Sequence, residues 1–353
     1  MTPIRYRTRW TLVALLALVA AAVAASTTLA ASTAAKPAKA GIVLIDTNLG
    51  YEGGQAAGTG MVLTSSGEVL TNNHVIQGAT TIRVVVPQSG RSYTASVVGY
   101  DIAADTAVLQ LKGASGLTTV TTGDSSKLAV GQTVRAIGNA GGSGTLATAQ
   151  GKVTGLGRRI TAGDGQGRSE QLTGLIDTDA PLQPGDSGGP LLDGSGAVVG
   201  MDTAASTAGQ GFYFQSAVAT DAYAIPIATA LSVAKQIEAG QSSATVHIGA
   251  TAFLGISVAM PTGSGYGYGS GFSTTTPAGA LVAGVVSNSA AARAGLAARD
   301  VITSIGGHAV SSQTTIVNVL LQVKPGSKIA LVWTDAFGNR QTATITLASG
   351  PPQ

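Results

Sequence analysis

The chain contains 353 residues, of which 44% are hydrophobic and only 10% are charged, so we expect folded domains rather than a solvated disordered chain. The formal net charge is +3, but the residues after position 40 include 15 basic and 17 acidic side chains, and this balance argues against a nucleic-acid partner. The chain has no cysteine, which excludes disulfides, zinc–thiolate sites and a thiol nucleophile.

The N-terminal 40 residues have the pattern of an export signal. Three arginines come first: Arg5, Arg7 and Arg9. An apolar run from Trp10 to Ala25 follows, and small residues near Ala30 and at 38–40 fit a cleavage site. We expect residues 1–40 to be a cleaved signal peptide, while a retained signal anchor, the only membrane attachment we expect, stays open because the uncharged stretch continues to Ala35. Both readings place the body of the protein outside the cytoplasm, secreted or in the cell envelope.

Short apolar or alternating runs, separated by turn residues, make up the region from residue 41 to about residue 225. Repeated short strands with glycine-rich turns predict a β-barrel or sandwich and argue against a doubly wound α/β sheet. The clearest runs are Thr81–Val86, Ala95–Tyr100, Thr106–Leu111 and Ala197–Met201.

A histidine and two aspartates lie at the ends of predicted strands in this region. His74 lies where an apolar run passes into a turn, which can hold an imidazole at the edge of a cleft. Asp105 directly precedes the run Thr106–Leu111, and Asp101 lies one turn earlier. An aspartate at either position is ordinary as a turn cap, so the residues alone leave the choice between the two open.

The six residues from Gly185 to Pro190, with the sequence Gly-Asp-Ser-Gly-Gly-Pro, are the strongest local signal in the chain. A serine hydroxyl is a poor nucleophile at neutral pH unless a base lies beside it and donors face the developing oxyanion. The flanking glycines let the backbone turn so that the amides of Gly185 and Ser187 can point at one oxygen. His74 is the only histidine in this region, so elimination makes it the candidate base for Ser187.

The same motif also fits the G-x-S-x-G nucleophile elbow of α/β-hydrolases. In that fold the acid and then the histidine follow the serine, which would leave only His247 or His308 as the base. Both lie in the C-terminal part of the chain, and the strand–helix alternation that such a fold needs before Ser187 is missing. Chain order therefore favours the all-β interpretation.

The first helical pattern comes late and is followed by a linker and a second domain. Apolar residues recur at helical spacing after Pro226, and Gly240 is the stop signal. The polar segment 240–246 is the predicted linker, and residues 247–350 mix strands with a helix around Thr315–Val323. This predicts a small α/β domain, in which the low-complexity segment 263–279 is a loop without chemistry of its own.

Five segments resemble HtrA/DegP-type serine proteases, most closely the secreted actinobacterial members. They are Thr71–Ile76, Asp105–Leu109, Ala136–Asn139, Gly185–Pro190 and Tyr223–Ile227. The resemblance implies an all-β, chymotrypsin-like protease domain of two six-stranded barrels over residues 41–239, with the active site between the barrels. It also implies that Asp105, rather than Asp101, completes a triad with His74 and Ser187. No metal or other cofactor is implied, and a homotrimer is the family expectation.

The sequence departs from the family at two places. Many members carry Asn where this chain has Asp186, and the segment from Phe212 to Ala222 looks like extra length in a loop that shapes the specificity pocket in relatives. The nearby residues Pro181, Ala204 and Ala205 are small and uncharged, which predicts a preference for small aliphatic residues before the scissile bond.

The region 247–350 resembles a PDZ domain. The residues that match its carboxylate-binding loop, whose backbone amides bind a peptide C-terminus, are Phe253, Leu254, Gly255 and Ile256. The segment from Ala291 to Leu296, followed by Asp300–Ile302, resembles the second block of the family. The expected contacts on the helix that forms the other wall of the groove are Ile316 and Leu320.

The family resemblance implies an exported endopeptidase that hydrolyses unfolded or damaged proteins and recognises peptide C-termini through its PDZ domain. A rival from another class is a binding or chaperone-like protein whose protease domain is silent at rest. Relatives of this type often depend on oligomer contacts and loop rearrangement to order the oxyanion hole, so the resting state stays open.

Overall fold

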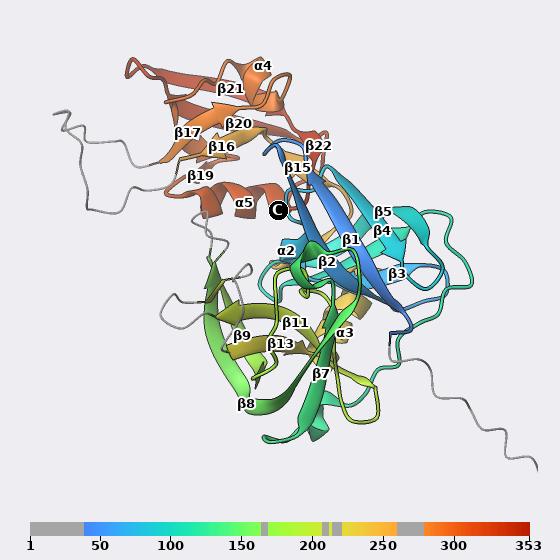
Figure 1. The fold of residues 1–353 in the computed structure, drawn as a ribbon. Coiled ribbons are helices and arrows are strands. Elements are labelled where there is room, and N and C mark those ends of the chain that lie inside the picture. The colour runs from blue at the N-terminus through green and yellow to red at the C-terminus, as the bar shows by residue number, and fades with distance from the viewer. Residues whose placement is uncertain (1–38, 164–168, 207–211, 214–220, 260–278) are drawn as a thin grey trace, which may run out of the picture. The chain divides into compact units, whose positions relative to one another are not determined.

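The computed structural model describes residues 39–163, 169–206, 212–213, 221–259 and 279–353 (Figure 1). Almost all of the predicted leader and of the low-complexity loop lies outside these residues. Among the described residues, no helix has the length and apolar character needed to cross a membrane.

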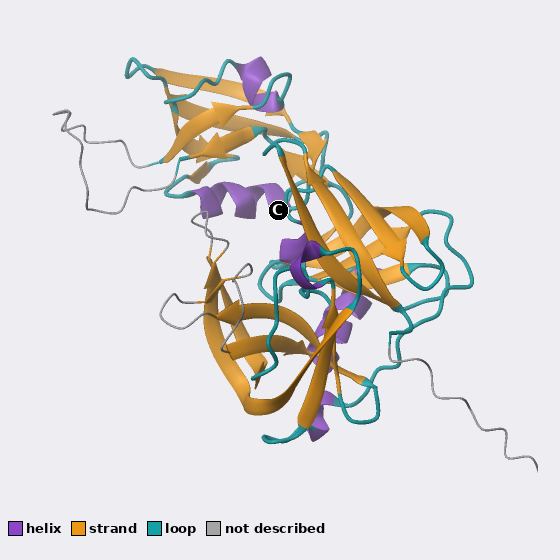
Figure 2. Cartoon of the chain, viewed as in Figure 1, coloured by secondary structure: helices purple, strands orange, loops and turns teal. Residues whose placement is uncertain are grey.

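Strands dominate the first part of the described chain (Figure 2). Seven of them form one sheet in the order β14-β5-β4-β1-β2-β3-β6, and the additional pairing of β5 with β6 closes it into a barrel. The short helix α2 (Asn73–Ile76) directly follows β3. The strands are β1 (Ile42–Leu49), β2 (Gly54–Val62), β3 (Glu68–Thr71), β4 (Thr81–Val86), β5 (Arg91–Asp101), β6 (Thr106–Leu111) and β14 (Val246–Ile248).

A second seven-stranded sheet has the order β10-β7-β8-β12-β11-β13-β9 and is closed by the pairings β10–β11 and β8–β9. The predicted all-β, two-barrel protease domain is therefore confirmed. The strands are β7 (Thr133–Gly138), β8 (Ala147–Gly163), β9 (Ser169–Thr178), β10 (Pro190–Leu192), β11 (Val198–Ser206), β12 (Phe212–Tyr213) and β13 (Asp221–Pro226), and the 3₁₀ turns are η1 (Ser125–Lys127) and η2 (Ala140–Gly142). Each described sheet has one strand more than the six expected, because β14 joins the first and the two-residue β12 joins the second.

The predicted late helix is α3 (Ile227–Glu238), which begins after Pro226 and is followed by Gly240 at φ +66°. Its buried side chains belong to a hydrophobic cluster that also includes Met61 of β2 and Ile137 of β7. One apolar core therefore unites α3 with strands of both barrels, and this holds the facing edges of the barrels in a fixed relation.

The C-terminal domain has its own core. A sheet runs in the order β16-β17-β18-β20-β21, with β19 beside β18, and β15 pairs separately with β22. The predicted helix around Thr315–Val323 is α5, which spans Gln313–Leu321. The elements are β15 (Thr251–Phe253), β16 (Ile256–Val258), β17 (Ala280–Val285), α4 (Ala290–Ala294), β18 (Val301–Ile305), β19 (His308–Ala309), α5, β20 (Lys328–Thr334), β21 (Arg340–Thr346) and β22 (Ala348–Gly350).

The boundary predicted between the linker and this domain differs from the structure. Val246–Ile248 is not the start of the C-terminal domain but a strand of the first barrel, where it pairs antiparallel with β5. Gly99 of β5 permits this approach, because a Cβ there would lie 2.6 Å from the carbonyl oxygen of His247. A three-residue strand has no alternating pattern of its own, and so the sequence carried no signal for it.

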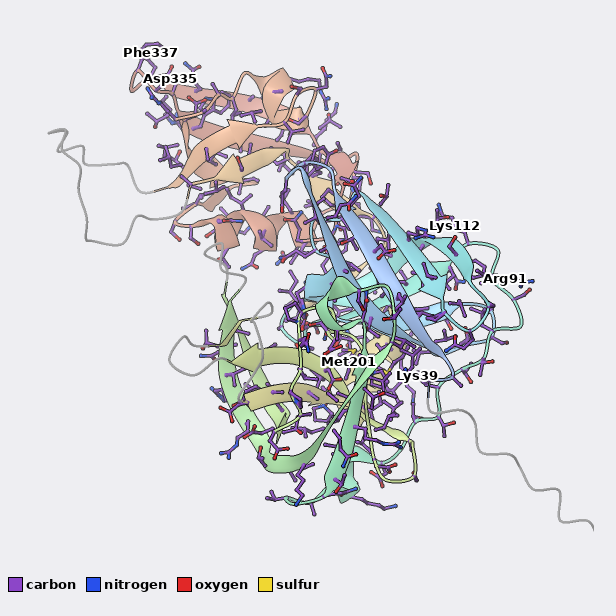
Figure 3. The ribbon with its side chains drawn as sticks, viewed as in Figure 1. Lys39, Arg91, Lys112, Met201, Asp335 and Phe337 are labelled. Atoms are coloured by element: carbon purple, nitrogen blue, oxygen red, sulfur yellow. The ribbon has the colours of Figure 1, made fainter. Side chains whose placement is uncertain are left out.

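The turn between β20 and β21 presents the most exposed large apolar side chain of the described chain, Phe337 (Figure 3). Asp335 shapes this turn by accepting hydrogen bonds from the backbone amides of Phe337 at 3.0 Å and Asn339 at 2.8 Å. Met201, by contrast, is fully buried in β11.

Candidate active site

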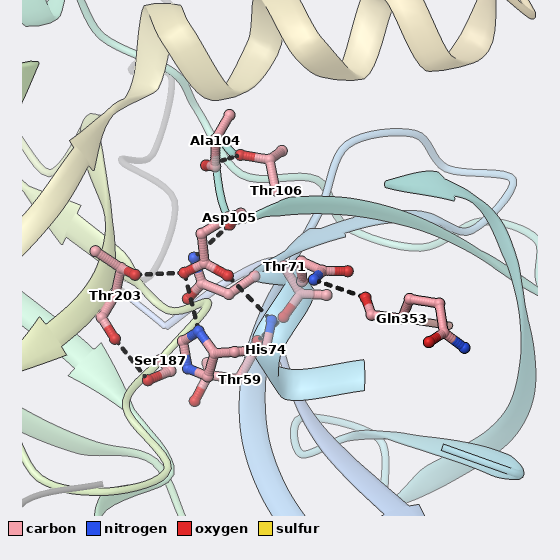
Figure 4. Close-up of polar contacts among 11 residues, drawn as sticks. Thr59, Thr71, His74, Ala104, Asp105, Thr106, Ser187, Thr203 and Gln353 are labelled. Atoms are coloured by element: carbon pink, nitrogen blue, oxygen red, sulfur yellow. Dashed lines mark hydrogen bonds and ion pairs between the residues drawn. The ribbon is translucent and has the colours of Figure 1, made fainter. Parts of the chain in front are cut away.

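His74 lies in α2, directly after β3, where its side chain is almost completely buried. The carboxylate of Asp105 contacts this residue twice: Oδ2 is 2.9 Å from the ring atom Nδ1, and Oδ1 accepts the backbone amide of His74 at 3.0 Å (Figure 4). Because Asp105 binds both the backbone amide and the ring of His74, the orientation of the imidazole is fixed and its Nε2 atom faces away from the carboxylate.

Asp105 itself is fully buried and has a left-handed backbone, with φ +43°. Besides the two contacts with His74, its Oδ2 atom accepts a hydrogen bond from the hydroxyl of Thr203. The side chain of Asn72 donates to the Asp105 carbonyl at 2.9 Å and so holds the strained turn in place. The buried carboxylate is therefore surrounded by donors, which offset its loss of hydration.

Asp101, the competing aspartate, does something different. Its Oδ1 accepts the backbone amide of Ala104 at 3.1 Å, and its Oδ2 accepts the hydroxyl of Thr245 at 2.9 Å. Asp101 therefore closes the turn, and the carboxylate that contacts His74 belongs to Asp105.

Ser187 lies between β9 and β10, and its hydroxyl donates to the carbonyl of Thr203 at 3.1 Å (Figure 4). A hydroxyl has one hydrogen, so this hydrogen must leave Thr203 before it can be donated to an imidazole. Thr203 contacts both sides of the site, because its hydroxyl binds Asp105 while its carbonyl binds Ser187. Sequence reasoning missed Thr203, which has no motif of its own.

Thr59 of β2 is a second residue that sequence reasoning missed. Its backbone amide donates to the Ser187 carbonyl at 2.8 Å, and its hydroxyl donates to the Gly185 carbonyl at 2.7 Å. The Thr59 carbonyl in turn accepts the hydroxyl of Thr71 at 2.7 Å. A strand of the first barrel thereby binds the loop that carries Ser187 in the second.

The two amides expected to form an oxyanion hole belong to Gly185 and Ser187. Within the described parts of the chain, neither amide donates a hydrogen bond to another residue. Gly185 has φ +95°, and a Cβ at this position would lie 2.2 Å from the carbonyl oxygen of Asn139, so only glycine fits. Both donors are thus available to an oxygen bound beside Ser187.

Two further buried carboxyl groups, Asp186 and Asp202, flank the Ser187 loop. Burial raises the pKa of Asp186 to about 6, although its Oδ2 accepts the backbone amide of Gln183 at 2.9 Å. Burial also raises the pKa of Asp202 well above its ordinary value, and the neighbouring charge of Asp186 adds to this effect. Neither side-chain oxygen of Asp202 has a hydrogen-bond partner in the described part of the structure.

The residues predicted to shape the specificity pocket are only partly described. Pro181 is exposed in the loop after β9. Ala204 and Ala205 lie in β11, opposite Tyr223 and Ala222 of β13, but their side chains lie outside the described residues. Most of the apparent extra segment 212–222 lies outside them as well, and the preference for small aliphatic residues stays a prediction.

The predicted carboxylate-binding loop connects β15 to β16. Gly255 has φ +84°, and a Cβ there would lie 2.1 Å from the Cβ of Ser289, so the loop requires glycine at this position. Leu254 is buried, while Phe253 and Ile256 are partly exposed at the ends of the flanking strands.

The two expected helix contacts of this groove belong to the core. Ile316 and Leu320 are only 3% and 4% exposed and pack in the hydrophobic cluster of the C-terminal domain. They support α5 from within, and a direct contact of either side chain with a peptide stays a prediction.

Two contacts connect the C-terminal residues to the segment that carries His74. The amide of Gly78 donates to the Pro352 carbonyl at 2.9 Å, and the side chain of Asn73 donates to the Gln353 carbonyl at 3.1 Å (Figure 4). These contacts steady α2, because Asn73 and Gly78 lie on either side of His74. Among the described residues, no group of three or more His, Cys, Asp or Glu side chains could hold a metal ion.

Comparison with known proteins identifies both domains. Residues 58–201 match the trypsin-like peptidase domain model, and residues 252–344 match a PDZ domain model. The serine protease PepD of Mycobacterium tuberculosis is 32% identical over 317 residues, which cover 87% of this chain and 63% of that protein. A probable periplasmic serine endoprotease DegP-like of Pseudomonas savastanoi pv. phaseolicola is 35% identical over 301 residues, covering 85% of this chain and 57% of that protein.

The chain thus spans about three fifths of the length of the curated relatives it matches. Among solved structures, the HtrA-type protease AlgW with tripeptide is 29% identical, with a TM-score of 0.48 over 89% of this chain and 95% of that one. The chain therefore has a region that matches a trypsin-like peptidase domain, followed by one that matches a PDZ domain, and over most of its length it is similar to serine proteases of the PepD and DegP-like type.

Proposed function

We propose that the chain is a serine endopeptidase in which Ser187 is the nucleophile, His74 the general base and Asp105 the residue that orients the imidazole. The observation that carries this proposal is the double contact of Asp105 with His74, at 2.9 and 3.0 Å, beside a serine whose flanking amides are available as donors. A buried carboxylate that fixes an imidazole in this way stabilises the imidazolium formed during proton transfer.

The reaction that fits this site is acyl transfer. The Ser187 hydroxyl turns from Thr203 towards His74, which takes its proton as Oγ bonds to the carbonyl carbon of a peptide. The amides of Gly185 and Ser187 stabilise the oxyanion of the tetrahedral intermediate. His74 then gives the proton to the leaving amine, and a water activated by the same imidazole hydrolyses the acyl-enzyme.

Substrates and location are further parts of the proposal. The arginines and apolar run of the leader, together with relatives named as periplasmic endoproteases, support an exported protein. The PDZ domain supports recognition of peptide C-termini, and we infer that unfolded or damaged exported proteins are the substrates. The homotrimer stays an expectation from the family.

One observation favours the second candidate, a binding protein with a silent protease domain. The hydrogen of the Ser187 hydroxyl is directed at the Thr203 carbonyl, which is a resting arrangement rather than one ready for attack. In this alternative, a bound peptide or an oligomer contact would have to release the hydroxyl before any reaction.

Fluorophosphonate labelling and casein cleavage by the purified full chain, measured beside Ser187→Ala, test the proposal. We expect labelling and cleavage by the natural sequence, neither by Ser187→Ala, and faster labelling when peptides with free C-termini are added. Absence of labelling under every condition, with peptide binding retained, would establish the binding protein instead.

A further inference from the structure

We propose that Thr59 is the positioning residue of the oxyanion hole, and that its hydroxyl sets the direction of the Gly185 amide from the opposite barrel. The inference rests on the proposed function, because it assigns Gly185 and Ser187 as the oxyanion donors. It goes beyond that function by naming a residue outside the triad whose hydroxyl the reaction requires.

The hydroxyl of Thr59 donates one hydrogen bond and accepts another. It donates to the Gly185 carbonyl at 2.7 Å and accepts the backbone amide of Asn139 at 2.9 Å, and the residue is fully buried. A hydroxyl can be donor and acceptor at once, so Ser or Thr can bridge a carbonyl and an amide at this position, whereas Val can do neither. The bridge joins β2 to the turn after β7 and to the loop that carries Ser187.

The peptide bond between Pro184 and Gly185 carries the first oxyanion donor, and its orientation is held from the carbonyl side. The amide of Gly141 donates to the Pro184 carbonyl at 2.7 Å. The C=O and N–H of a planar trans peptide point in opposite directions. The Gly185 N–H must therefore point away from Gly141 for as long as this bond is made.

The peptide bond between Asp186 and Ser187 carries the second donor and is held in the same manner. The amide of Gly189 donates to the Asp186 carbonyl at 2.9 Å, which turns the Ser187 N–H to the opposite side. The amide of Thr59 donates to the next carbonyl, that of Ser187, at 2.8 Å. Thr59 thus fixes carbonyls on either side of the Asp186–Ser187 peptide.

Asn139 holds the turn that contains Gly141. The side-chain oxygen of Asn139 accepts the Gly144 amide at 2.8 Å, and its carbonyl accepts the Gly142 amide at 2.8 Å. Gly141 and Gly142 have φ +66° and +65°, so the turn is built for glycine. The Asn139 amide donates to the Thr59 hydroxyl, and this hydroxyl donates to the Gly185 carbonyl. Loss of the hydroxyl therefore removes one hydrogen bond from the turn and one from the Ser187 loop.

Thr59→Val and Thr59→Ser form the central test, because Val has nearly the size of Thr but no hydroxyl, whereas Ser keeps the hydroxyl and loses only a methyl group. We expect Thr59→Val to lower kcat for a peptide substrate about 10- to 100-fold with KM changed less than about threefold, since removing one oxyanion donor costs up to about 10³-fold. Thr59→Ser should restore kcat to within about threefold of the natural sequence.

Thr47→Val is the matched control. Thr47 is also a buried threonine of the first barrel, and its hydroxyl donates to the Ala56 carbonyl at 3.3 Å, away from the Ser187 loop. A general loss of stability would affect Thr47→Val and Thr59→Val alike, whereas loss of positioning affects only the second. If Thr59→Val fails to fold, Asn139→Ala loosens the same turn without changing Thr59 and should lower kcat with little change in KM.

Hydrogen exchange of the segment 183–190, measured in the Ser187→Ala background, separates this inference from the proposed function. We expect faster exchange of the Asp186 amide in Thr59→Val than in Thr59→Ser, because this amide donates to the Gln183 carbonyl at 3.0 Å and lies in the same peptide plane as the Gly185 carbonyl that Thr59 binds. An unreactive natural sequence in which this difference persists would overturn the proposed function but not the positioning role. Unchanged exchange of the Asp186 amide, or a kcat in Thr59→Val within about threefold of the natural sequence, would overturn the inference.

Discussion

Asp105, a buried carboxylate of the first barrel, is surrounded by hydrogen-bond donors, whereas two buried carboxyl groups of the second barrel have almost none. Asp105 accepts hydrogen bonds from the backbone and ring of His74 and from the Thr203 hydroxyl. Asp186 accepts one from the amide of Gln183, and Asp202 accepts none from the described residues. All three side chains are nearly or fully buried, so burial alone does not distinguish them.

Hydrogen-bond donors offset the loss of hydration that burial imposes on a carboxyl group. Without compensating donors, burial favours the neutral acid, and this raises the pKa of Asp186 and that of Asp202. A fixed carboxylate thus lies behind the imidazole of His74, while the loop of Ser187 is flanked by acids that take up protons readily. Four substitutions test this difference between the carboxyl groups of the two barrels.

The largest effect is expected from Asp105→Asn. An amide cannot both hold the His74 ring in the orientation that Asp105 gives it and stabilise the imidazolium, so kcat/KM at pH 7.5 should fall about 10³- to 10⁴-fold. Asp101→Asn is the matched control, because it keeps the oxygen that accepts the Ala104 amide and should retain activity within about threefold. Equal losses in the two variants would show that Asp105 acts only through the fold.

Asp186→Asn should alter the pH dependence of stability. With a folded-state pKa of about 6 against an ordinary 3.8, the stability that Asp186 contributes is fully present below pH 3.8 and is lost as pH rises through 6. The loss amounts to at most ~3 kcal/mol, at about 1.4 kcal/mol for each unit of pKa. The free energy of unfolding from urea titrations at pH 4 to 8 should therefore fall less steeply with pH in Asp186→Asn. Parallel curves for the two proteins would contradict an uncompensated charge at Asp186.

Thr203→Val should have a smaller effect, on activity alone. The substitution removes the hydroxyl that binds Asp105 but keeps the carbonyl that binds Ser187. Losing one hydrogen bond to a buried carboxylate should lower kcat about 10-fold, and Thr203→Ser should restore it. Steady-state kinetics at pH 7.5 measure both, and full activity in Thr203→Val would mean that His74 alone suffices to hold Asp105.

The smallest effect is expected from Asp202→Asn. Burial raises the pKa of Asp202 and so favours its neutral form, which an amide of the same size resembles, and stability should therefore change by less than about 1 kcal/mol. Thermal unfolding at pH 7 provides the measurement. Stabilisation by more than about 3 kcal/mol would reveal an ionised Asp202. The buried carboxyl groups of the two barrels would then differ less in charge than their hydrogen-bond donors indicate.

Much of the site was predictable because its chemistry lies in short segments. The Ser187 motif, the single histidine before Ser187 and the helical spacing after Pro226 are local signals. The structure has the expected helix after Pro226 and places Asp105 against His74, whereas the Ser187 hydroxyl donates to Thr203. The choice between Asp101 and Asp105 was not a local matter, because both precede the same strand. The family resemblance implied Asp105, and the fold separates the two directly by bringing His74 to Asp105.

What the sequence could not predict depends on contacts between distant segments. Thr59 and Gly185 are 126 residues apart, and Thr203 and Asp105 are 98 residues apart. The sequence around a strand threonine is the same whether its hydroxyl faces solvent or bridges two loops. No sequence pattern therefore indicated the contacts of Thr59 and Thr203. The strand β14 was missed for a related reason, since its only partner, β5, begins 155 residues earlier at Arg91.

The bond from Thr59 to the Ser187 loop also has a consequence for biosynthesis. Contacts between residues so distant in the chain form late, after the loop between them has been closed. During synthesis, strands β1 to β6 and His74 emerge before the serine loop exists, and that loop gains its partners only when the second barrel closes on the first. Under the proposed function, the peptidase centre would therefore form only after the strands of both barrels have been made, so the early part of the chain is not exposed to its activity while still unfolded.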